Sequence, residues 1–378
     1  MQVVKLLTLP TLPPSKGHNL VLDETPETHP DDVLVAVFPQ DPLVDRNNPL
    51  LVSIPRQEME TDGARLENEW FITTNMRSPR RLEPDENGNY LYAPGTPEFA
   101  HVNAHVHATK TVQMVERLYG KPIPWQFGNP NRQRVAVHVN SGRTGDSHTN
   151  FGPRNIKLDT YQSSSLGKEV KDAECAEAIA HEVGHDILQG LRPQHSEGDN
   201  ETGAFGESFG DQVAILYTME FDRNRERALK QTGGNLRHQN LISKLFEEDG
   251  KSQRLMANPN ANSGYWLRSA INDTQYHPEA EVKEYEVHEQ SLPYTAAFYA
   301  TLAGTYERNM EAGQSPTTAL LNARDTLGKV WARSLDYLPE KNIHFTDGLN
   351  ALLRADQELG CGLTAIMTES FADHGIKS

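Results

Sequence analysis

The sequence contains only two cysteines, Cys175 and Cys361, among its 378 residues. A framework of disulfides therefore does not hold this chain together. No apolar run approaches the roughly 20 residues that a membrane-spanning helix needs. The segment Met1–Pro14 is interrupted by Lys5 and three prolines, and it lacks a basic start followed by a long apolar run. We therefore do not expect it to act as a secretory signal, which leaves a cytoplasmic location open.

Positive charge is also scarce. The chain has 36 lysines and arginines against 52 aspartates and glutamates, so its net charge is −16. A surface of that sign repels phosphate backbones and anionic lipids, so we expect neither nucleic acid nor a membrane as a partner. The length is sufficient for two lobes with their own cores, and no internal repeat is visible.

What the sequence does contain is the pentapeptide His181–His185, with the letters HEVGH. Residues four apart lie on one face of a helix, so two imidazoles at this spacing can point at one tetrahedral zinc ion. Glu182 lies one step round the helix, where it can hold a water that the metal acidifies. The same pattern also arises by chance on solvated helix faces, so the pentapeptide alone leaves both interpretations open.

A second pair of acidic residues follows, with 21 residues between His185 and Glu207. A catalytic zinc keeps three protein ligands and one open position, and Glu207 is the candidate third ligand. Glu207 and Asp211 repeat the four-residue spacing, so they share one face of a second helix. We predict that Asp211 accepts the spare N–H of His181.

With this pair included, the sequence resembles the thermolysin-like zinc metallopeptidases. Glu201–Asp211 is similar to the third-ligand region of that family. Tyr265–Asp273 resembles its Leu-Arg-Ser segment, and Val287–Ser291 resembles its Val-His-x-x-Ser segment. The likeness extends from about residue 99 to about residue 375. Fungalysin-like peptidases share the zinc elements and are a close second.

The resemblance implies an extracellular zinc endopeptidase that hydrolyses internal bonds of peptides or proteins. Glu182 would be the general base, Arg268 would contact a substrate carbonyl, and His288 would stabilise the tetrahedral intermediate. An extended peptide would dock along an edge strand that begins near Asn150. Leu267 would line the pocket that selects the substrate side chain.

The sequence departs from the family pattern before the third ligand. The loop Pro193–Asn200 lacks the tyrosine that helps the family bind the oxyanion, and His195 is the residue that could take its place. Gly206 stands where the family often has asparagine. These differences keep open a non-catalytic, zinc-binding descendant. A zinc aminopeptidase also stays open, although no Gly-x-Met-x-Asn segment precedes the zinc helix.

Two further departures concern His288 and calcium. The family's histidine is steered by an acidic residue, but Lys283 stands near that place here, with Glu284 and Glu286 beside it. Thr218 stands where a calcium-binding carboxylate is expected. The resemblance leaves calcium open as a second cofactor, but no calcium ligands are assigned.

We expect an α+β fold of two lobes with zinc in the cleft. Residues 96–190 would form the N-terminal catalytic lobe that ends in the zinc helix, and residues 191–378 a helical C-terminal lobe. Residues 1–95 could be a β-rich extension, a pro-segment or part of the first lobe. Alternating valines predict strands at Val33–Val37 and Arg134–Asn140.

Helical periodicity predicts a helix over Phe99–Tyr119, with His101, His105 and His107 on a polar face or, less simply, in a second metal site. Asp172 is expected to cap the zinc helix. The other predicted helices cover Gly203–Asp222, Asn240–Glu248, Pro293–Met310, residues 316–338, Thr346–Leu359 and Thr364–Asp373.

Overall fold

The computed structural model of the chain combines helices with a mixed six-stranded sheet, which confirms the α+β composition. Among the residues that it describes, none of the helices is both long and apolar enough to cross a bilayer. The structure describes residues 29–46, 48–77, 81–125, 134–145, 147–152, 154–277 and 286–378.

The sheet has the strand order β3-β4-β5-β6-β8-β7. Its centre is parallel, because Val137 of β6 pairs with Thr73 of β5 on one side and with Ile156 of β8 on the other. Strand β7 is antiparallel to β8 and is the last strand of the sheet in the described part of the chain. The expected edge strand that begins near Asn150 is therefore wrong, because β7 ends at Asn150 and the next strand, β8, is internal to the sheet. The bounds are β3 Glu60–Thr61, β4 Arg65–Glu67, β5 Phe71–Asn75, β6 Val135–Val139, β7 His148–Asn150 and β8 Asn155–Leu158.

The described residues before position 95 are part of this same structure. Strands β3, β4 and β5 belong to the sheet, and a hairpin of β1 (Asp32–Val37) and β2 (Leu50–Pro55) pairs Val33 with Ile54. A boundary at residue 95 would separate β5 from its parallel partner β6. The described residues before position 95 therefore share one sheet with residues that follow it.

Helix α2 (Pro97–Tyr119) follows the prediction closely, but the expected polar face of histidines is wrong. His101, His105 and His107 are at most 1% exposed. His101 Nε2 lies 2.8 Å from the carbonyl of Thr73, and His105 Nε2 lies 2.6 Å from the carbonyl of Glu58. Each ring therefore satisfies buried polar groups of a neighbouring segment, which a helical wheel cannot show.

The two helices that carry the predicted metal ligands are α3 (Ala176–Leu191) and α4 (Asn200–Thr218). The expected cap Asp172 is wrong, because Asp172 begins a short 3-10 turn, Asp172–Glu174, and Cys175 occupies the cap position. The side chain of Asp199 caps α4 by accepting the N–H of Thr202 at 2.9 Å. The predicted helix Gly203–Asp222 therefore begins earlier and ends sooner.

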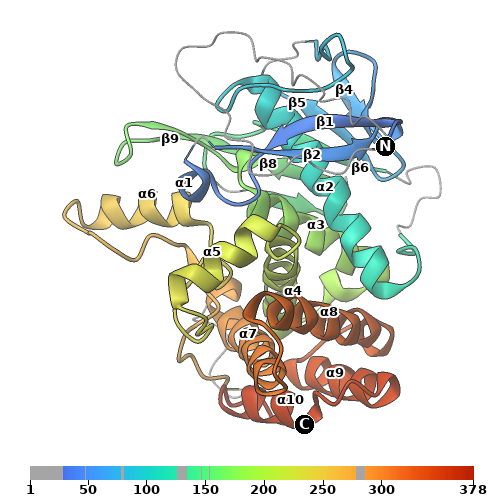
Figure 1. Cartoon of the computed structure of the whole chain (residues 1–378), viewed down its shortest axis with the longest axis vertical. Helices are drawn as coiled ribbons and strands as arrows, with labels where there is room; N and C mark the ends of the chain where they lie inside the picture. The colour runs from blue at the N-terminus through green and yellow to red at the C-terminus, as the bar shows by residue number, and fades with distance from the viewer. Residues whose placement is uncertain are drawn as a thin grey trace, which may run out of the picture.

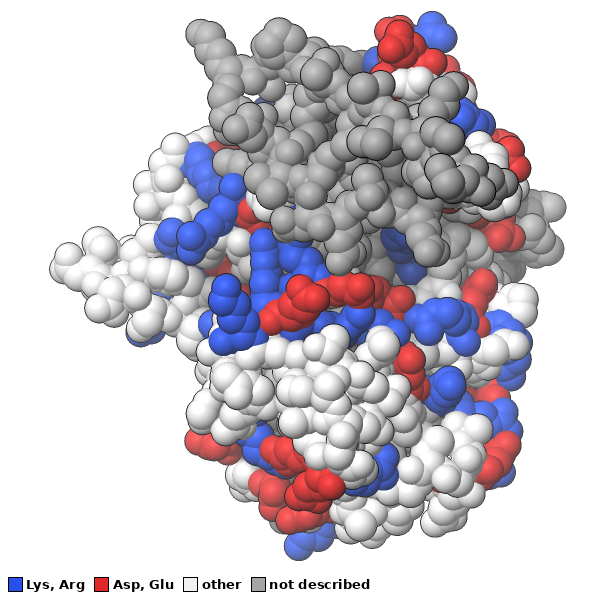
Figure 2. Space-filling model, viewed as in Figure 1, with Lys and Arg blue, Asp and Glu red and all other residues white. Residues whose placement is uncertain are grey.

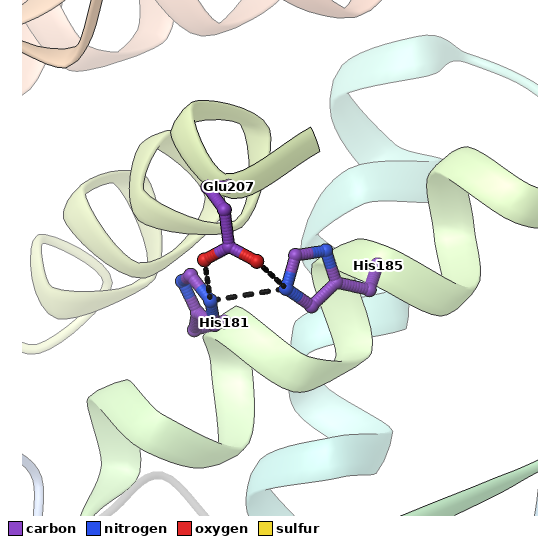
Figure 3. A group of neighbouring side chains, drawn as sticks. All are labelled: His181, His185 and Glu207. Atoms are coloured by element: carbon purple, nitrogen blue, oxygen red, sulfur yellow. Dashed lines mark hydrogen bonds and ion pairs between the residues drawn. The ribbon is translucent and has the colours of Figure 1, made fainter. Parts of the chain in front are cut away.

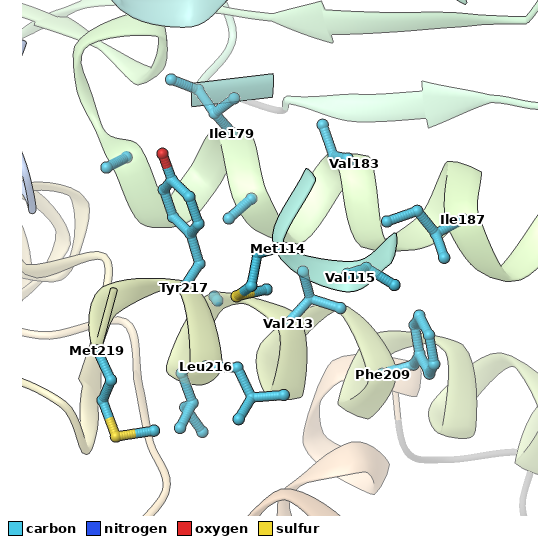
Figure 4. Packing of buried hydrophobic residues seen from close by; sticks show 14 of the residues in the cluster. Met114, Val115, Ile179, Val183, Ile187, Phe209, Val213, Leu216, Tyr217 and Met219 are labelled. Atoms are coloured by element: carbon cyan, nitrogen blue, oxygen red, sulfur yellow. The ribbon is translucent and has the colours of Figure 1, made fainter. Parts of the chain in front are cut away.

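Helices α3 and α4 pack closely along most of their length. Ile179, Val183 and Ile187 of α3 face Phe209 and Val213 of α4, and all five are fully buried (Figure 4). A Cβ added at Gly184 would lie 3.0 Å from the Cα of Gly210. The missing side chains let the two backbones come close, and this closeness brings the ligand faces together.

Helices α7 to α10 form the end of the molecule away from the sheet, with α3 and α4 between (Figure 1). The predicted helix Asn240–Glu248 is wrong, because a turn and strand β11 occupy it and the helix α6 begins at Glu247. The remaining elements are α1 Pro42–Asp45, β9 Thr160–Ser163, β10 Lys168–Lys171, α5 Asp222–Thr232, β11 Lys244–Leu245, α6 Glu247–Ala257, β12 Arg268–Ser269, α7 Val287–Glu311, α8 Pro316–Ser334, α9 Phe345–Leu359 and α10 Thr364–Ala372.

Candidate metal centre

Three side chains from α3 and α4 converge on one point (Figure 3). His181 Nε2 lies 3.1 Å from His185 Nε2 and 3.4 Å from Glu207 Oε2. His185 Nε2 lies 3.5 Å from Glu207 Oε1. Among the described residues, these three form the group whose ligand atoms lie close enough to share one metal ion. The structure thus brings together the three residues that the sequence predicted as ligands.

The spacing of these atoms suits zinc. A tetrahedral ion with bonds of about 2.0–2.1 Å separates neighbouring ligand atoms by about 3.3 Å. The three observed separations, 3.1, 3.4 and 3.5 Å, lie close to that value. The donor set of two imidazoles and one carboxylate is one that catalytic zinc sites use. The residues present therefore fit a zinc ion with one position left for water or substrate.

Asp211 and Arg268 contact the cluster of candidate ligands. Asp211 Oδ1 lies 3.0 Å from His181 Nδ1 as an ion-pair contact without hydrogen-bond geometry, so the hydrogen bond expected between them stays a prediction. Arg268 Nη2 lies 3.2 Å from the same oxygen, and Arg268 Nη1 lies 3.2 Å from Glu207 Oε2. The hydroxyl of Thr295 reaches the other oxygen of Asp211 at 3.4 Å. This fully buried carboxylate is therefore held from several sides, which fixes the direction of His181.

Charges in the cluster are strongly coupled. Burial and Arg268 act to lower the pKa of His181, but Asp211 and Glu207 outweigh them and raise it to about 9. Burial lowers the pKa of His185 to about 3. Burial acts to raise the pKa of Glu207, but His185, His181 and His288 bring it well below its usual value. A metal ion would take the place of the proton on His181, so its binding weakens in acid.

Glu182 lies beside the ligands without being one of them. Its Oε2 accepts a hydrogen bond of 2.8 Å from the hydroxyl of Thr149, which also lies 3.0 Å from the Glu182 carbonyl. Burial raises the pKa of Glu182, although His181 and the Thr149 hydroxyl oppose the rise. A buried carboxylate with a raised pKa suits a group that must accept a proton near neutral pH.

A cavity of about 370 Å³ opens over the cluster. Edge strand β7 and its flanks form one wall, and the segment from His195 to Glu207 forms another. Val287 and His288 at the start of α7 complete it. The candidate ligands, Glu182 and the edge strand therefore all line one cavity.

His288 stands on the open side of the cavity. Its Nε2 lies 3.1 Å from Glu207 Oε2, and its Nδ1 contacts the carboxylate of Glu286. The hydrogen bond with Glu207 raises the pKa of His288 against the effect of its partial burial. Glu286 is the acidic residue that contacts His288. Glu284, the other acidic candidate, and Lys283 lie outside the described residues.

Three residues that the resemblance assigned to the substrate lie outside the cavity lining. Asn150, in β7, uses its amide to donate to Asn155 Oδ1 at 3.0 Å across the hairpin. Leu267 is 44% exposed, directly before Arg268. The Arg268 guanidinium is engaged with Glu207 and Asp211 beside the ligands. Their expected substrate contacts stay predictions.

The sequence reasoning missed three supporting residues. Thr149 lies close to the predicted edge strand, and that position could have suggested it. Phe246 has a left-handed backbone with φ of 60°, and its ring centroid lies 5.6 Å from that of His181 and 4.9 Å from Cζ of Arg268. Gly210 leaves room for the His181 ring, because a Cβ there would lie 2.6 Å from His181 Nδ1. No local pattern in the sequence indicates the last two.

No protein-family model matches this chain, and a search of curated proteins finds no significant match. A function for the chain therefore has to be inferred from the side chains that converge at His181, His185 and Glu207.

Proposed function

We propose that the protein is a zinc-dependent metalloendopeptidase that hydrolyses internal peptide bonds. The observation that carries the proposal is the convergence of His181, His185 and Glu207 at zinc-like separations, with Glu182 beside them in one cavity. A thermolysin-like arrangement of two lobes, with the strand-rich part ending in α3 and the helices below it, belongs to the same proposal. Calcium remains possible without assigned ligands.

His181, His185 and Glu207 would hold the zinc, which when bound supplies a Lewis acid that lowers the pKa of a coordinated water to about 7 and polarises a carbonyl. The carboxylate of Glu182, held by Thr149, takes the proton from the attacking water and delivers it to the leaving amine. His288, at the cavity mouth, donates a hydrogen bond to the negative charge that develops on the carbonyl oxygen.

Arg268 lies directly beside the ligands, with Nη2 3.5 Å from His181 Nε2. Its guanidinium lies between Glu207 and Asp211, where it offsets the repulsion between the two carboxylates. The outer side of β7, the last strand of the sheet in the described part of the chain, would hold an extended peptide by backbone hydrogen bonds. The chain's residues thereby supply ligands, a base, a donor and a docking edge around one cavity.

A non-catalytic zinc protein is the second candidate. It is favoured by the loop Pro193–Asn200, which has no tyrosine for an oxyanion. An aminopeptidase is distinguished by its need for a free amino terminus.

One experiment separates these functions. The purified protein is loaded with zinc, analysed for bound metal, and incubated with a library of peptides blocked at both ends. Endopeptidase function predicts about one zinc per chain, internal cleavage of blocked peptides, and loss of cleavage after chelation. Bound zinc without cleavage of blocked or free peptides indicates the non-catalytic protein. Cleavage of free peptides alone indicates an aminopeptidase, and a chain that binds no zinc refutes all three.

A further inference from the structure

One wall of the cavity carries an unused hydrogen-bonding nitrogen. His195 is 5% exposed, and its ring lies edge-on to Phe151 with centroids 5.2 Å apart. Its Nδ1 lies 3.0 Å from the carbonyl oxygen of Arg192. A carbonyl oxygen only accepts hydrogen bonds, so Nδ1 must carry the hydrogen. Nε2 makes no hydrogen bond with the described residues, and His195 belongs to the lining of the cavity.

This tautomer decides what Nε2 can do. Burial lowers the pKa of His195, although the Arg192 carbonyl opposes that change, so the ring is neutral near pH 7. A neutral imidazole with its hydrogen on Nδ1 has a lone pair on Nε2. It therefore accepts a hydrogen bond and donates none from that atom. His195 consequently does not replace the tyrosine that the family uses to donate to an oxyanion.

The surroundings of His195 are acidic and roomy. The lining of the cavity includes Asp199, whose carboxylate is half exposed, and it includes no lysine or arginine among the described residues. Gly198, Gly203 and Gly206 line the same side and contribute no side chains to fill it. One oxygen of Asp199 accepts from Thr202, and the other lies 3.0 Å from His344 Nε2. The carboxylate still supplies lone pairs, since each oxygen can accept more than one hydrogen bond.

We propose that this wall, formed by His195 and Asp199, binds an ammonium or guanidinium group of the substrate next to the scissile bond. An ammonium or guanidinium group in the cavity can donate to the lone pair of His195 Nε2, and the Asp199 carboxylate in the same lining offsets its charge. The net charge of −16 would also favour the approach of a cationic peptide. The inference rests on the proposed peptidase function and assigns it a substrate class: peptides with a lysine or arginine close to the cleaved bond.

The test compares lysine with norleucine, which has a side chain of similar length without the ammonium group. Peptides that the zinc-loaded protein cleaves are prepared in acetylated pairs that differ only in this residue, placed in turn at each position around the bond. We expect a kcat/KM roughly 3- to 10-fold higher for the lysine member at one position, as a half-exposed charged hydrogen bond allows. An unacetylated norleucine peptide shows whether a terminal amine serves as well as a side chain.

Two variants remove the proposed contacts singly. Asp199→Asn keeps an oxygen that can cap α4 but removes the charge. His195→Asn keeps a donor near the place of Nδ1 and removes Nε2. Each should reduce the preference for lysine to less than about 2-fold. Glu197→Gln is the matched control, because Glu197 is two residues from Asp199, pairs with Lys341 and lies outside the cavity lining. It should retain the preference.

Equal cleavage of lysine and norleucine peptides at every position would overturn the inference and leave the peptidase function intact. A loss of preference in Glu197→Gln as large as in Asp199→Asn would also overturn it, since the effect would then be one of overall charge. If no peptide is cleaved, the proposed function fails. The wall is then judged by calorimetry with the same pairs on zinc-loaded protein, where equal affinity overturns it and tighter lysine binding supports it.

Discussion

Consecutive residues of α3 point their side chains at different partners because of helix geometry. One residue corresponds to about 100° of turn, so His181 and Glu182 point in different directions although they are consecutive. His181 faces Glu207 and Asp211, whereas the Glu182 carboxylate meets Thr149 on the edge strand. Asp211 and Thr149, from two other elements, would thus hold one residue in the place of a ligand and the next in the place of a base under the proposed function.

Replacing Glu182 with glutamine tests this division. We expect Glu182→Gln to retain zinc and its melting temperature, because no ligand is lost and the amide has nearly the same shape. Peptide hydrolysis should be abolished, because an amide cannot accept a proton from water at neutral pH. Zinc content, thermal unfolding and peptidase rate are measured on this one variant. Full activity would remove Glu182 from the mechanism, and loss of zinc would make it a ligand.

Thr149 should act as a positioning residue for Glu182. We expect Thr149→Val to lower kcat roughly 10-fold with little change in KM, because it removes a hydrogen bond to a charged group while keeping the shape. Thr149→Ser keeps the hydroxyl and should retain most of the rate. A valine variant with the wild-type kcat, or a serine variant as slow as the valine variant, would show that the hydroxyl has no such role.

The buried His105 should make stability depend on pH. Burial lowers its pKa to about 4, while the unfolded chain binds the proton near the ordinary histidine pKa of 6.5. The unfolded state therefore gains protons first as the pH falls, and stability decreases between about 6.5 and 4. As the pH falls through this window, the free energy of unfolding of the wild type should decrease, relative to that of His105→Gln, by roughly 1 kcal/mol per pH unit. Denaturant titrations at pH 7, 6 and 5 measure it, and parallel curves would contradict it.

At the scale of elements, the crossing of α3 and α4 brings the three candidate metal ligands together. The helices can approach because Gly184 and Gly210 face each other, and the ring of His181 lies over Gly210. A methyl group at Gly210 would lie 2.6 Å from Nδ1 and 2.9 Å from Cγ of that ring. Real Cβ atoms essentially never come this close to another heavy atom, so either the His181 ring or the helix must move.

We therefore expect Gly210→Ala to weaken zinc binding by roughly 10-fold or more, the usual result of disturbing a ligand's orientation. Gly206→Ala is the matched control on the same helix, because its Cβ would meet only Leu188 Cδ2, at 4.0 Å. It should bind zinc normally and gain up to about 1 kcal/mol of stability from helix propensity. Competition with a chromophoric chelator measures the affinities, and equal values for both variants would contradict this account of the helix crossing.

The sequence predicted elements where local signals agree. Alternating valines located β1 and β6, and Ser315-Pro316 located the start of α8, where Ser315 accepts the N–H of Thr318. The prediction failed over Asn240–Glu248, where Asn240 turns the chain with its side chain and Glu247 begins the helix. Such a segment takes its conformation from tertiary contacts, which local propensity does not contain.

The candidate site shows the same limit. The four-residue spacing indicated His181 with His185 and Glu207 with Asp211, because each pair lies within one helix. Thr149 acts on Glu182 from 33 residues away in sequence, and Arg268 acts on Glu207 from 61 residues away. Contacts of this kind depend on how the elements pack, so the sequence could indicate Arg268 only through a family resemblance and could not indicate Thr149's role at all.

At the scale of the whole molecule, acidic and basic side chains are mixed on the face that Figure 2 draws. The face drawn in Figure 2 has lysine and arginine interleaved with aspartate and glutamate across its middle. One ion pair of this kind joins Arg117 to Glu220 at 2.7 Å between α2 and the end of α4. The net charge of −16 therefore does not mark that face as a docking surface, and recognition of charge would depend on individual carboxylates such as Asp199.

Helix α2 joins the N-terminal segment to the rest of the molecule through its polar residues. Asn103 accepts the N–H of Phe38 at 2.9 Å and donates to the carbonyl of Ala173 at 2.9 Å. His101 and His105 bond to the carbonyls of Thr73 and Glu58. Without the residues before 95, these buried groups lose their partners, and each lost partner costs roughly 1–3 kcal/mol.

A chain of residues 96–378 should therefore fail to fold cooperatively. It would lack β5, which pairs with β6, in addition to the partners of the α2 histidines. Circular dichroism and thermal unfolding, compared with the whole chain, measure the outcome. Adding residues 1–95 as a separate polypeptide is the control, and it should restore a cooperative transition and zinc binding if the loss comes from missing contacts. A fragment 96–378 that melts cooperatively and binds zinc alone would instead make residues 1–95 a separable extension.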